Sequence, residues 1–201
     1  LVILTGDIDL SVGAILPLVG GLSVMVFNAT DNVLLTLVFA LAMGAVCGFI
    51  NGALVGYAKM PAFIVTLSTM LIYRSLSQYT LRIQGQSIYN MNGTLPSYDS
   101  FYGFGQSKLA SIPSVGLVFI AITVLMVFIA TSTKFGKSVY AIGSNERAAR
   151  LAGVNVKAVR VQVFTITGIL CGLSAFLWLA MNGSVDPATV GKSNEMYAIA
   201  A

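Results

Sequence analysis

A basic stretch between two long apolar segments constrains the fold more than any other feature of this chain. Residues 131–160 carry six of the eleven Lys and Arg residues, namely Lys134, Lys137, Arg147, Arg150, Lys157 and Arg160. One Lys or Arg at a bilayer centre costs roughly 2.5–3.5 kcal/mol, so six would cost about 15–21 kcal/mol. The stretch therefore lies in water, and its positive charge beside apolar segments marks its side of the membrane as cytoplasmic.

The apolar segments set the fold class. The chain is 57% hydrophobic and only 9% charged, with a mean hydropathy of +0.88. These values predict an all-α, polytopic transmembrane helical bundle with about five complete spans and partial ones at each cut end. The complete spans are expected at residues 10–27, 33–57, 62–81, 115–130 and 161–181. Residues 1–201 are then a single transmembrane domain, a fragment lacking N- and C-terminal helices, in which residues 132–160 form a cytoplasmic loop.

Alternation of the spans agrees with the distribution of charge. The predicted cytoplasmic sides hold seven basic residues, Lys59 among them, whereas the external segments at 82–114 and 182–194 hold Arg82, Lys108 and Lys192. This matches the rule that positive charge stays inside. Arg74 lies within a span, and its long side chain is expected to reach outward to the interface.

The basic loop contains a predicted short helix. Ser144 or Asn145 suits its N-cap, Glu146 falls in its first turn, where the helix dipole favours an anion, and Gly153 suits the position after its end. Glu146 and Arg150 are spaced to pair on one face, and small apolar residues such as Ala148 and Ala149 occupy the other. Two interpretations remain: a docking helix, or an ordinary amphipathic turn at the membrane surface.

A second feature is a break in the apolar pattern near the start of the chain. It contains Gly6, Asp9, Ser11 and Gly13. Asp9 is predicted to cap the following helix by accepting N–H bonds from Ser11 or Val12. The alternative is a broken helix that lines a transport pathway.

A stripe of glycines follows in the second predicted span. Gly44, Gly48, Gly52 and Gly56 recur every four residues, so they share one helix face and predict close packing against another helix. Asn51 lies beside this stripe. It is expected either to bond across a helix pair or to face a cavity.

The third predicted span carries hydroxyl groups along one face. They belong to Thr66, Thr69, Tyr73, Ser77 and Thr80. Such a stripe suits the lining of a pathway for a polar solute. Hydroxyls can also bond back to their own helix, so a purely structural role remains open.

Several chemistries are excluded. The chain has no His, which removes Ser-His and Cys-His nucleophile pairs, HExxH zinc sites and His proton relays. Gly136-Lys137-Ser138 resembles the end of a phosphate-binding loop, but Thr131 stands where that motif needs its first glycine. Topology explains the basic charge better than nucleic-acid binding does. We therefore expect no catalytic residue, no metal and no cofactor, and a protein that is not itself an enzyme.

Four blocks of sequence indicate a family. They are Leu4–Gly13 (LTGDIDLSVG), Pro61–Thr69 (PAFIVTLST), Thr133–Gly153 (TKFGKSVYAIGSNERAARLAG) and Glu195–Ala201 (EMYAIAA). Together they resemble the sugar-importing permeases of bacterial ABC transporters, in the ribose, galactose, xylose and arabinose group. Two positions depart from the family pattern: Asp7 replaces the usual second glycine, and Met196-Tyr197 replaces Leu-Asp.

The resemblance implies a permease subunit in the lipid of the bacterial plasma (inner) membrane. Its substrate would be a monosaccharide, a ribose-like pentose or a hexose. Its partners would be a second permease copy (identical or a close paralogue), an extracytoplasmic sugar-binding protein and a cytoplasmic ABC ATPase that hydrolyses ATP and drives alternating access. Residues 132–160 would be the coupling loop, with the ATPase contact at Ser144, Asn145, Glu146, Ala148, Ala149 and Gly153.

Other functions remain open. Acids beside a broken helix are also typical of ion-coupled secondary transporters, which coordinate Na⁺ or protons there. An ABC permease for another small polar solute, such as an amino acid, is a further alternative. An intramembrane enzyme is disfavoured, because Asp7 and Asp9 lie on one short break and His is missing.

Overall fold

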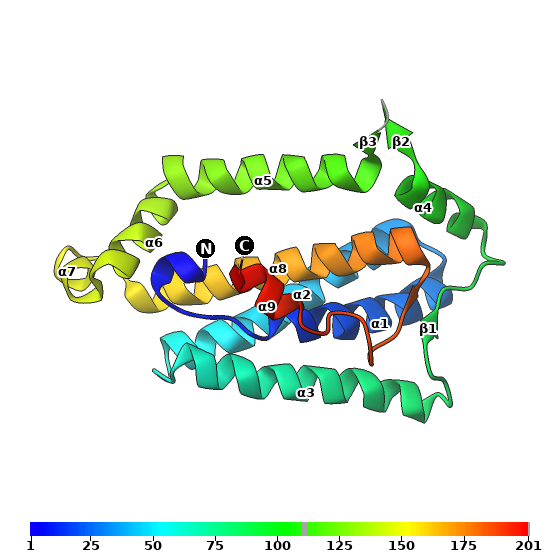
Figure 1. Ribbon diagram of the computed structural model, residues 1–201, viewed down its shortest axis with the longest axis horizontal. Coiled ribbons are helices and arrows are strands. Elements are labelled where there is room, and N and C mark those ends of the chain that lie inside the picture. The colour runs from blue at the N-terminus through cyan, green and yellow to red at the C-terminus, as the bar shows by residue number, and fades with distance from the viewer. Residues whose placement is uncertain (110–111, 201) are drawn as a thin grey trace.

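The computed structural model describes residues 1–109 and 112–200, which are mostly helical (Figure 1). In chain order the elements are the 3₁₀ helix η1 (Ile3–Thr5), α1 (Val12–Thr30), α2 (Val33–Gly56), α3 (Ala62–Ile83), β1 (Tyr89–Asn90), α4 (Pro96–Gln106), β2 (Lys108–Leu109), β3 (Ile112–Pro113), α5 (Ser114–Ser132), α6 (Lys134–Ser144), α7 (Glu146–Leu151), α8 (Val156–Asn182), β4 (Ser184–Val185) and α9 (Asn194–Ala200). The predicted polytopic all-α bundle is confirmed, because the long helices run roughly along one axis.

Four helices in the described part of the chain are long and apolar enough to cross a membrane: α1, α2, α5 and α8. The remaining predicted span, the third, corresponds to α3, which has 22 residues but is less apolar. Its hydroxyl groups, Arg74 and Arg82 account for the difference. It nevertheless packs beside α1 and α2 and runs along the same axis (Figure 1).

Local sequence explains where several helices begin. The Asn32 side chain accepts a bond of 3.0 Å from the backbone N–H of Leu35 at the start of α2. Asn155 accepts one of 3.2 Å from Ala158 at the start of α8. Such caps satisfy backbone donors that lack partners within the helix. Consequently α8 begins at Val156, five residues before the predicted start.

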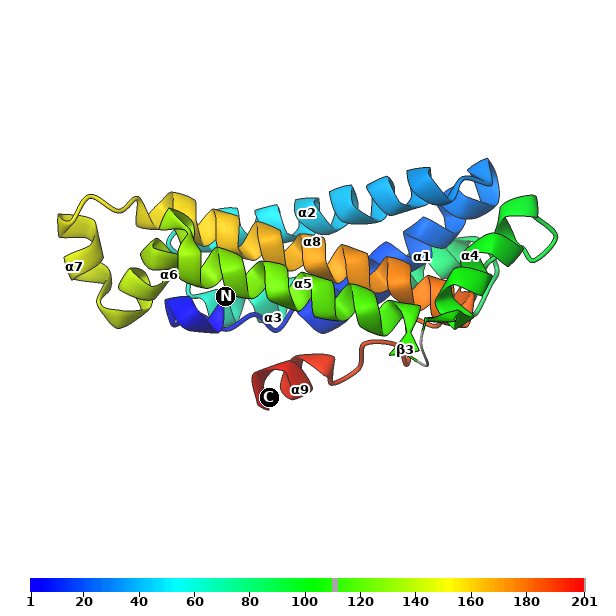
Figure 2. The same cartoon turned by 90° about the horizontal axis from the view of Figure 1, so that it is seen from above.

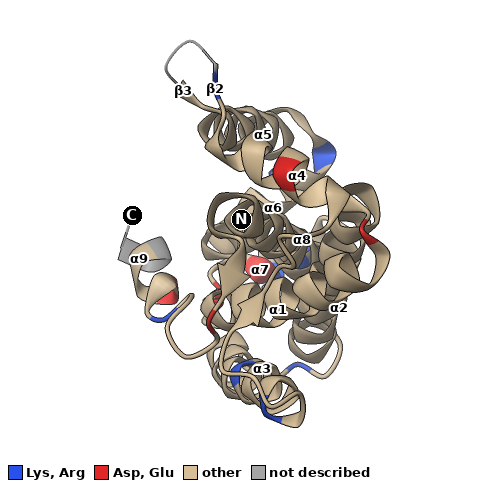
Figure 3. Cartoon of the chain, turned by 90° about the vertical axis from the view of Figure 1, so that its right-hand side faces the viewer, with Lys and Arg blue, Asp and Glu red and all other residues tan. Residues whose placement is uncertain are grey.

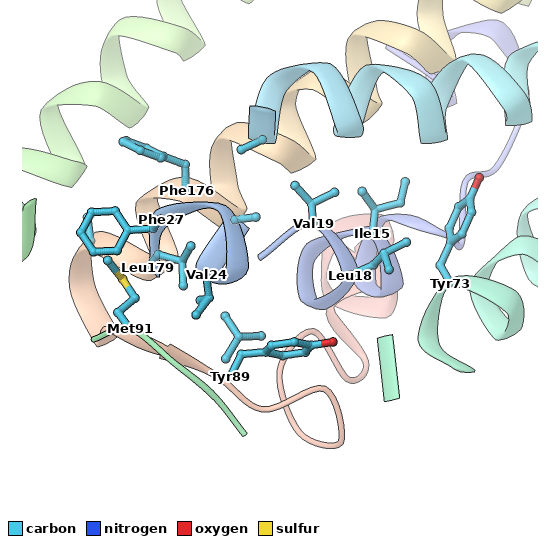
Figure 4. Close-up of a cluster of buried hydrophobic side chains, with 14 of the residues drawn as sticks. Ile15, Leu18, Val19, Val24, Phe27, Tyr73, Tyr89, Met91, Phe176 and Leu179 are labelled. Carbon is cyan, nitrogen blue, oxygen red and sulfur yellow. The ribbon is translucent and has the colours of Figure 1, made fainter. Parts of the chain in front are cut away.

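Helix α1 lies at the centre of the larger core cluster. Ile15, Leu18, Val19 and Phe27 are almost fully buried and are surrounded by side chains from α3, β1 and α8 (Figure 4). Pro17 also lies within α1, and the Ser77 hydroxyl of α3 donates to its carbonyl oxygen at 3.1 Å. Apolar burial on all sides makes α1 the central element of the bundle.

The two ends of the bundle differ. At one end, β1 pairs antiparallel with β4, and the Asn28 side chain donates to the Asn90 carbonyl oxygen at 2.9 Å. At the other end, α6 and α7 extend beyond the long helices (Figures 1 and 2). Lys59 borders the same cavity as Glu146 at this end. The basic loop and Lys59 thus share one side, as the charge distribution predicts.

Helix α5 is the exception to the packing. None of its described residues is buried, although it is among the most apolar helices. It contacts α4 and α6 at its two ends and stands apart from the other long helices (Figure 1).

Seen along the bundle, charged residues are sparse and most of the ribbon carries none (Figure 3).

Candidate functional site

The predicted short helix in the basic loop is present as α7. Asn145 is its N-cap, and its side-chain oxygen accepts a bond of 3.1 Å from the backbone N–H of Ala148. Ser144 instead ends α6. Gly153 has φ +83°, a left-handed conformation that glycine adopts without strain, and it redirects the chain toward α8. A sharp turn at each end therefore makes α7 project from the end of the bundle (Figure 1).

The candidate contact residues on and around α7 differ in exposure. Ser144, Asn145, Ala148 and Gly153 are exposed, Glu146 is half-buried and Ala149 is buried. The most exposed large apolar side chain described is Leu151, with 92% of its surface accessible. Leu151 and the exposed Ala148 make this face of α7 the candidate contact surface.

Charged residues surround the base of α7. Arg160 of α8 donates from Nε to Asp7 Oδ2 at 3.0 Å and from Nη2 to Glu146 Oε2 at 3.1 Å. Arg150 pairs with the other oxygen of Glu146. We call Asp7, Glu146, Arg150 and Arg160 the charged cluster. It borders a cavity of about 300 Å³ that Lys59 and Lys157 also line.

The charged cluster shifts the ionisation of Glu146. Its partial burial alone would raise the pKa. The hydrogen bonds and positive charges of Arg150 and Arg160 outweigh burial, so the pKa of Glu146 lies below its usual range. Glu146 is therefore ionised at neutral pH.

The break before α1 is extended chain that enters the bundle. Gly6 has φ +78°, which ends η1. Asp9 Oδ1 accepts bonds from the backbone N–H of Ser11 at 2.9 Å and from its hydroxyl at 2.6 Å. Asp9 thus bonds one of the two predicted donors, but it is not the cap of α1: the N-cap is Ser11, whose side chain makes no capping bond. We refer to residues 1–11 as the pre-α1 segment.

Two further helices hold this segment. Asn51 of α2 is fully buried, and its amide donates to the Ser11 hydroxyl at 2.7 Å. The Thr66 hydroxyl of α3 lies between two acceptors, the Ala62 carbonyl oxygen of its own helix at 2.9 Å and the Ile8 carbonyl oxygen at 3.2 Å. Asp9, Ser11 and Asn51 form a chain of buried hydrogen bonds that fixes the start of α1 against α2.

The hydroxyl stripe of α3 faces the other helices of this chain. Thr66, Thr69, Tyr73 and Ser77 are all buried. Thr69 bonds back to its own helix, whereas Tyr73 donates to the Cys47 carbonyl oxygen of α2 at 3.1 Å. A hollow of about 680 Å³ lies on a different face of α3. Residues of α3 alone line it: Leu71, Ile72, Ser75, Leu76, Gln78, Tyr79 and Arg82.

The glycine stripe of α2 lies directly against α8. A Cβ on Gly44 would overlap the carbonyl oxygen of Gly168, and one on Gly48 would overlap that of Phe164. At Gly52 and Gly56 it would lie 2.8 Å from the Cα of Val161 and the carbonyl oxygen of Lys157, respectively. We call this contact the glycine interface. Because both backbones meet without intervening side chains, α2 and α8 behave as one rigid pair.

Two predictions about position are wrong. Arg74 does not reach outward: its guanidinium donates to the carbonyl oxygens of Pro187 at 3.2 Å and Gly13 at 3.4 Å. Residues 182–194 do not stay outside as a simple turn. They fold back along α1 until the backbone of Gly191 contacts that of Gly13. This close contact is possible because neither residue has a side chain. Helix α9 consequently lies beside the middle of the bundle (Figure 1).

Sequence reasoning also missed two features. Helix α6 lies where the sequence analysis predicts a loop. Val139 and Ile142 are spaced for one apolar face and are buried, and the Thr133 side chain caps the helix by accepting the backbone N–H of Gly136. The bonds of Arg160 were missed because Asp7 is 153 residues away in the sequence. The first feature left a periodic signal in the sequence, whereas the second did not.

The whole chain, residues 1–201, matches the family model described as the permease component of the branched-chain amino acid transport system. The chain belongs to this family. The helical bundle and the projecting α7 described above are therefore those of a transport permease. No solved structure is detectably similar to it.

Curated relatives match along the whole chain. The ribose import permease RbsC of Escherichia coli (strain K12) is 35% identical over 206 residues, covering 100% of this chain and 61% of the relative. The fructose import permease FrcC of Rhizobium meliloti is 33% identical, with 100% and 56% covered. The autoinducer 2 import permease LsrC of Yersinia pseudotuberculosis (strain YPIII) is 34% identical, with 100% and 55% covered. The chain thus spans about six-tenths of the length of these relatives.

Proposed function

We propose that this chain is the membrane-embedded part of a permease subunit in an ATP-driven ABC importer for a monosaccharide. The substrate is a ribose-like pentose or a hexose, and the protein lies in the bacterial plasma membrane. An extracytoplasmic binding protein delivers the sugar, a second permease copy completes the pathway, and a separate cytoplasmic ATPase supplies the energy. Relatives named for ribose and fructose import support the substrate class.

The observation that carries the proposal is the shape of the basic loop. Residues 132–160 place α7 beyond the end of the bundle, where the 92% exposed Leu151 and the exposed Ala148 face away from the chain. A short helix in a groove is a common mode of protein recognition. In the proposal, the ATPase groove receives α7, and Ser144, Asn145, Glu146, Ala148, Ala149 and Gly153 form or shape this contact.

The transport step is alternating access. Closure of the paired ATPase domains on ATP moves the α7 helices of the two permease copies together and opens the pathway to the binding protein. Hydrolysis and separation then open it inward. We propose that the pathway is lined by residues from a set of five polar candidates, Asn51, Thr66, Thr69, Tyr73 and Ser77. Asn51 and Thr66 contact the segment before α1, and rearrangement of these contacts accompanies the change.

Copurification of the full-length parent from mild detergent tests the proposal. Wild-type protein should retain a cytoplasmic ATPase. Leu151→Ser removes the exposed apolar contact and Glu146→Lys reverses the charge at the base of α7, so both should lose it. Leu34→Ser is the matched control: Leu34 is 69% exposed at the opposite end of the bundle, and its replacement should leave the ATPase bound.

A parent that purifies alone and takes up solute in an ion gradient without ATP would overturn the proposal. It would favour an ion-coupled secondary transporter, in which the buried Asp9 carboxylate is the natural ion ligand. Uptake of amino acids but not sugars, with the ATPase retained, would keep the transport mechanism and correct the substrate class.

A further inference from the structure

The charged cluster joins α7 and α8, which are consecutive in the sequence, to the distant pre-α1 segment. The Arg160 side chain, only 20% exposed, donates from Nε to the Asp7 carboxylate at 3.0 Å and from Nη2 to the Glu146 carboxylate at 3.1 Å. Asp7 belongs to the pre-α1 segment, Glu146 to α7 and Arg160 to α8. A guanidinium presents several donors in a fixed plane, so it can hold two carboxylates in a fixed relation where a lysine ammonium cannot.

Close packing against α6 reinforces this junction. The carbonyl oxygen of Leu4 lies against Gly143 of α6, so closely that a side chain at position 143 would overlap it. Val2 is buried in the same cluster as Val139 and Ile142 of α6. The first part of the pre-α1 segment therefore packs directly on α6 and is joined to α7 by charge only through Arg160 of α8.

The other end of the same segment reaches the buried hydrogen bonds of the transmembrane helices. Only Ile8 stands between Asp7 and Asp9. Asp9 bonds Ser11, Ser11 receives the amide of Asn51, and Ile8 receives the Thr66 hydroxyl. A displacement of Asp7 is thus transmitted within a few covalent bonds to the start of α1 and to its contacts with α2 and α3.

We propose that Arg160 is a positioning residue that couples α7 to the pre-α1 segment, so that movement of α7 by the ATPase shifts the broken start of α1. The inference rests on the proposed function and adds the residue through which the movement passes. Arg160 lies in the first turns of α8, next to the glycine interface that fixes this helix to α2. It therefore serves as a fixed pivot between two elements that move. The cavity of about 300 Å³ beside it leaves room for the motion.

Reconstituted full-length permease, ATPase and binding protein test this pivot. The variants are Asp7→Asn, Arg160→Gln and the double variant. The readouts are ATPase retention, ATP hydrolysis and uptake of ribose or fructose, whichever the wild type transports. Each single variant should retain the ATPase and hydrolyse ATP, while sugar transported per ATP falls at least about fivefold, the lower end of typical coupling energies. The double variant should transport as much sugar per ATP as Arg160→Gln, because the two substitutions remove the same connection between Asp7 and Arg160.

Controls separate coupling from folding. Asp7→Glu keeps the charge and should restore most of the transport per ATP. Asp186→Asn removes a carboxylate that bonds only within its own turn at the opposite end, and it should leave the ratio unchanged.

Three results would overturn the inference. An unchanged ratio of transport to hydrolysis in Asp7→Asn and Arg160→Gln would show that the cluster is merely structural. Loss of the ATPase from these variants would place Arg160 in the docking surface instead. A wild-type parent that binds no ATPase would overturn the proposed function itself, and the pivot with it.

Discussion

The glycine interface and the charged cluster both hold α8, but they do so by different physics. Along the middle of α8, backbone meets the backbone of α2 with no side chain between them, so any displacement creates a void or a clash. At its start, α8 is joined to α7 and the pre-α1 segment by partly exposed ion pairs. Such pairs are weak and adjustable, because water and salt compete with them. The glycine interface is therefore suited to rigidity and the charged cluster to movement.

The largest effect should come from Gly48→Val in the glycine interface. The new side chain would overlap the Phe164 carbonyl oxygen, forcing α2 and α8 apart. We expect a loss of about 3 kcal/mol of stability or failure to fold. Thermal unfolding in detergent measures it. Gly103→Ala in α4 is the control, because a Cβ there meets nothing within 4 Å, and it should be neutral or slightly stabilising.

A smaller effect is expected from Asn51→Leu. This change keeps the branching of the side chain, adds some volume at a buried site and removes the donor to the Ser11 hydroxyl, so stability should fall by about 2 kcal/mol. Ser68→Ala provides the comparison, since the Ser68 hydroxyl is exposed and bonds only to Ile64 of its own helix. Equal stability of the two variants in thermal unfolding would show that the buried hydrogen-bond chain adds nothing.

Arg160→Gln should cost less stability than either change above. Glu146 keeps Arg150 as a partner, and the Glu146 and Asp7 side chains are 34% and 12% exposed, so we expect a loss of about 1 kcal/mol. Arg147→Gln, on an exposed position of α7, should change nothing. If Arg160→Gln destabilised the protein as much as Gly48→Val, the contrast between a rigid and an adjustable contact would be wrong.

The smallest effect concerns pH. The pKa of Glu146 is lowered in the folded protein, so its ion pairs stabilise the protein above the pKa of the unfolded carboxyl. This contribution is lost as pH falls through the folded pKa. Melting curves of wild type and Glu146→Gln should therefore differ slightly at neutral pH and converge in acid. A difference that persisted once the carboxyl is protonated would assign the effect to packing.

Most of the fold was accessible from the sequence. The apolar segments predicted the long helices, and Asn145, Glu146 and Gly153 predicted α7, because caps and helix dipoles are local signals. The glycine stripe at 44–56 predicted a close helix contact but not its partner. Periodicity identifies a face of a helix, and only the packed structure shows that α8 covers it.

The errors arose where distant parts of the chain meet. Arg74 binds the backbone carbonyls of Gly13 and Pro187 because residues 182–194 fold back along α1. No local sequence pattern predicts that this segment folds back. The bond between Arg160 and Asp7 is similar, since each residue alone looks like an ordinary surface charge. Sequence analysis therefore located the candidate α7 helix but not the connection from it to α1.

The glycine interface also sets an order of assembly in the cell. Its two halves, α2 and α8, are separated by all of α3 to α7, so the stripe has no partner while the first helices enter the membrane. Until α8 is synthesised, that flat face is covered by lipid chains or by the insertion machinery. The rigid part of the permease is thus completed late, and a chain stalled before α8 would present the glycine face to quality-control proteases.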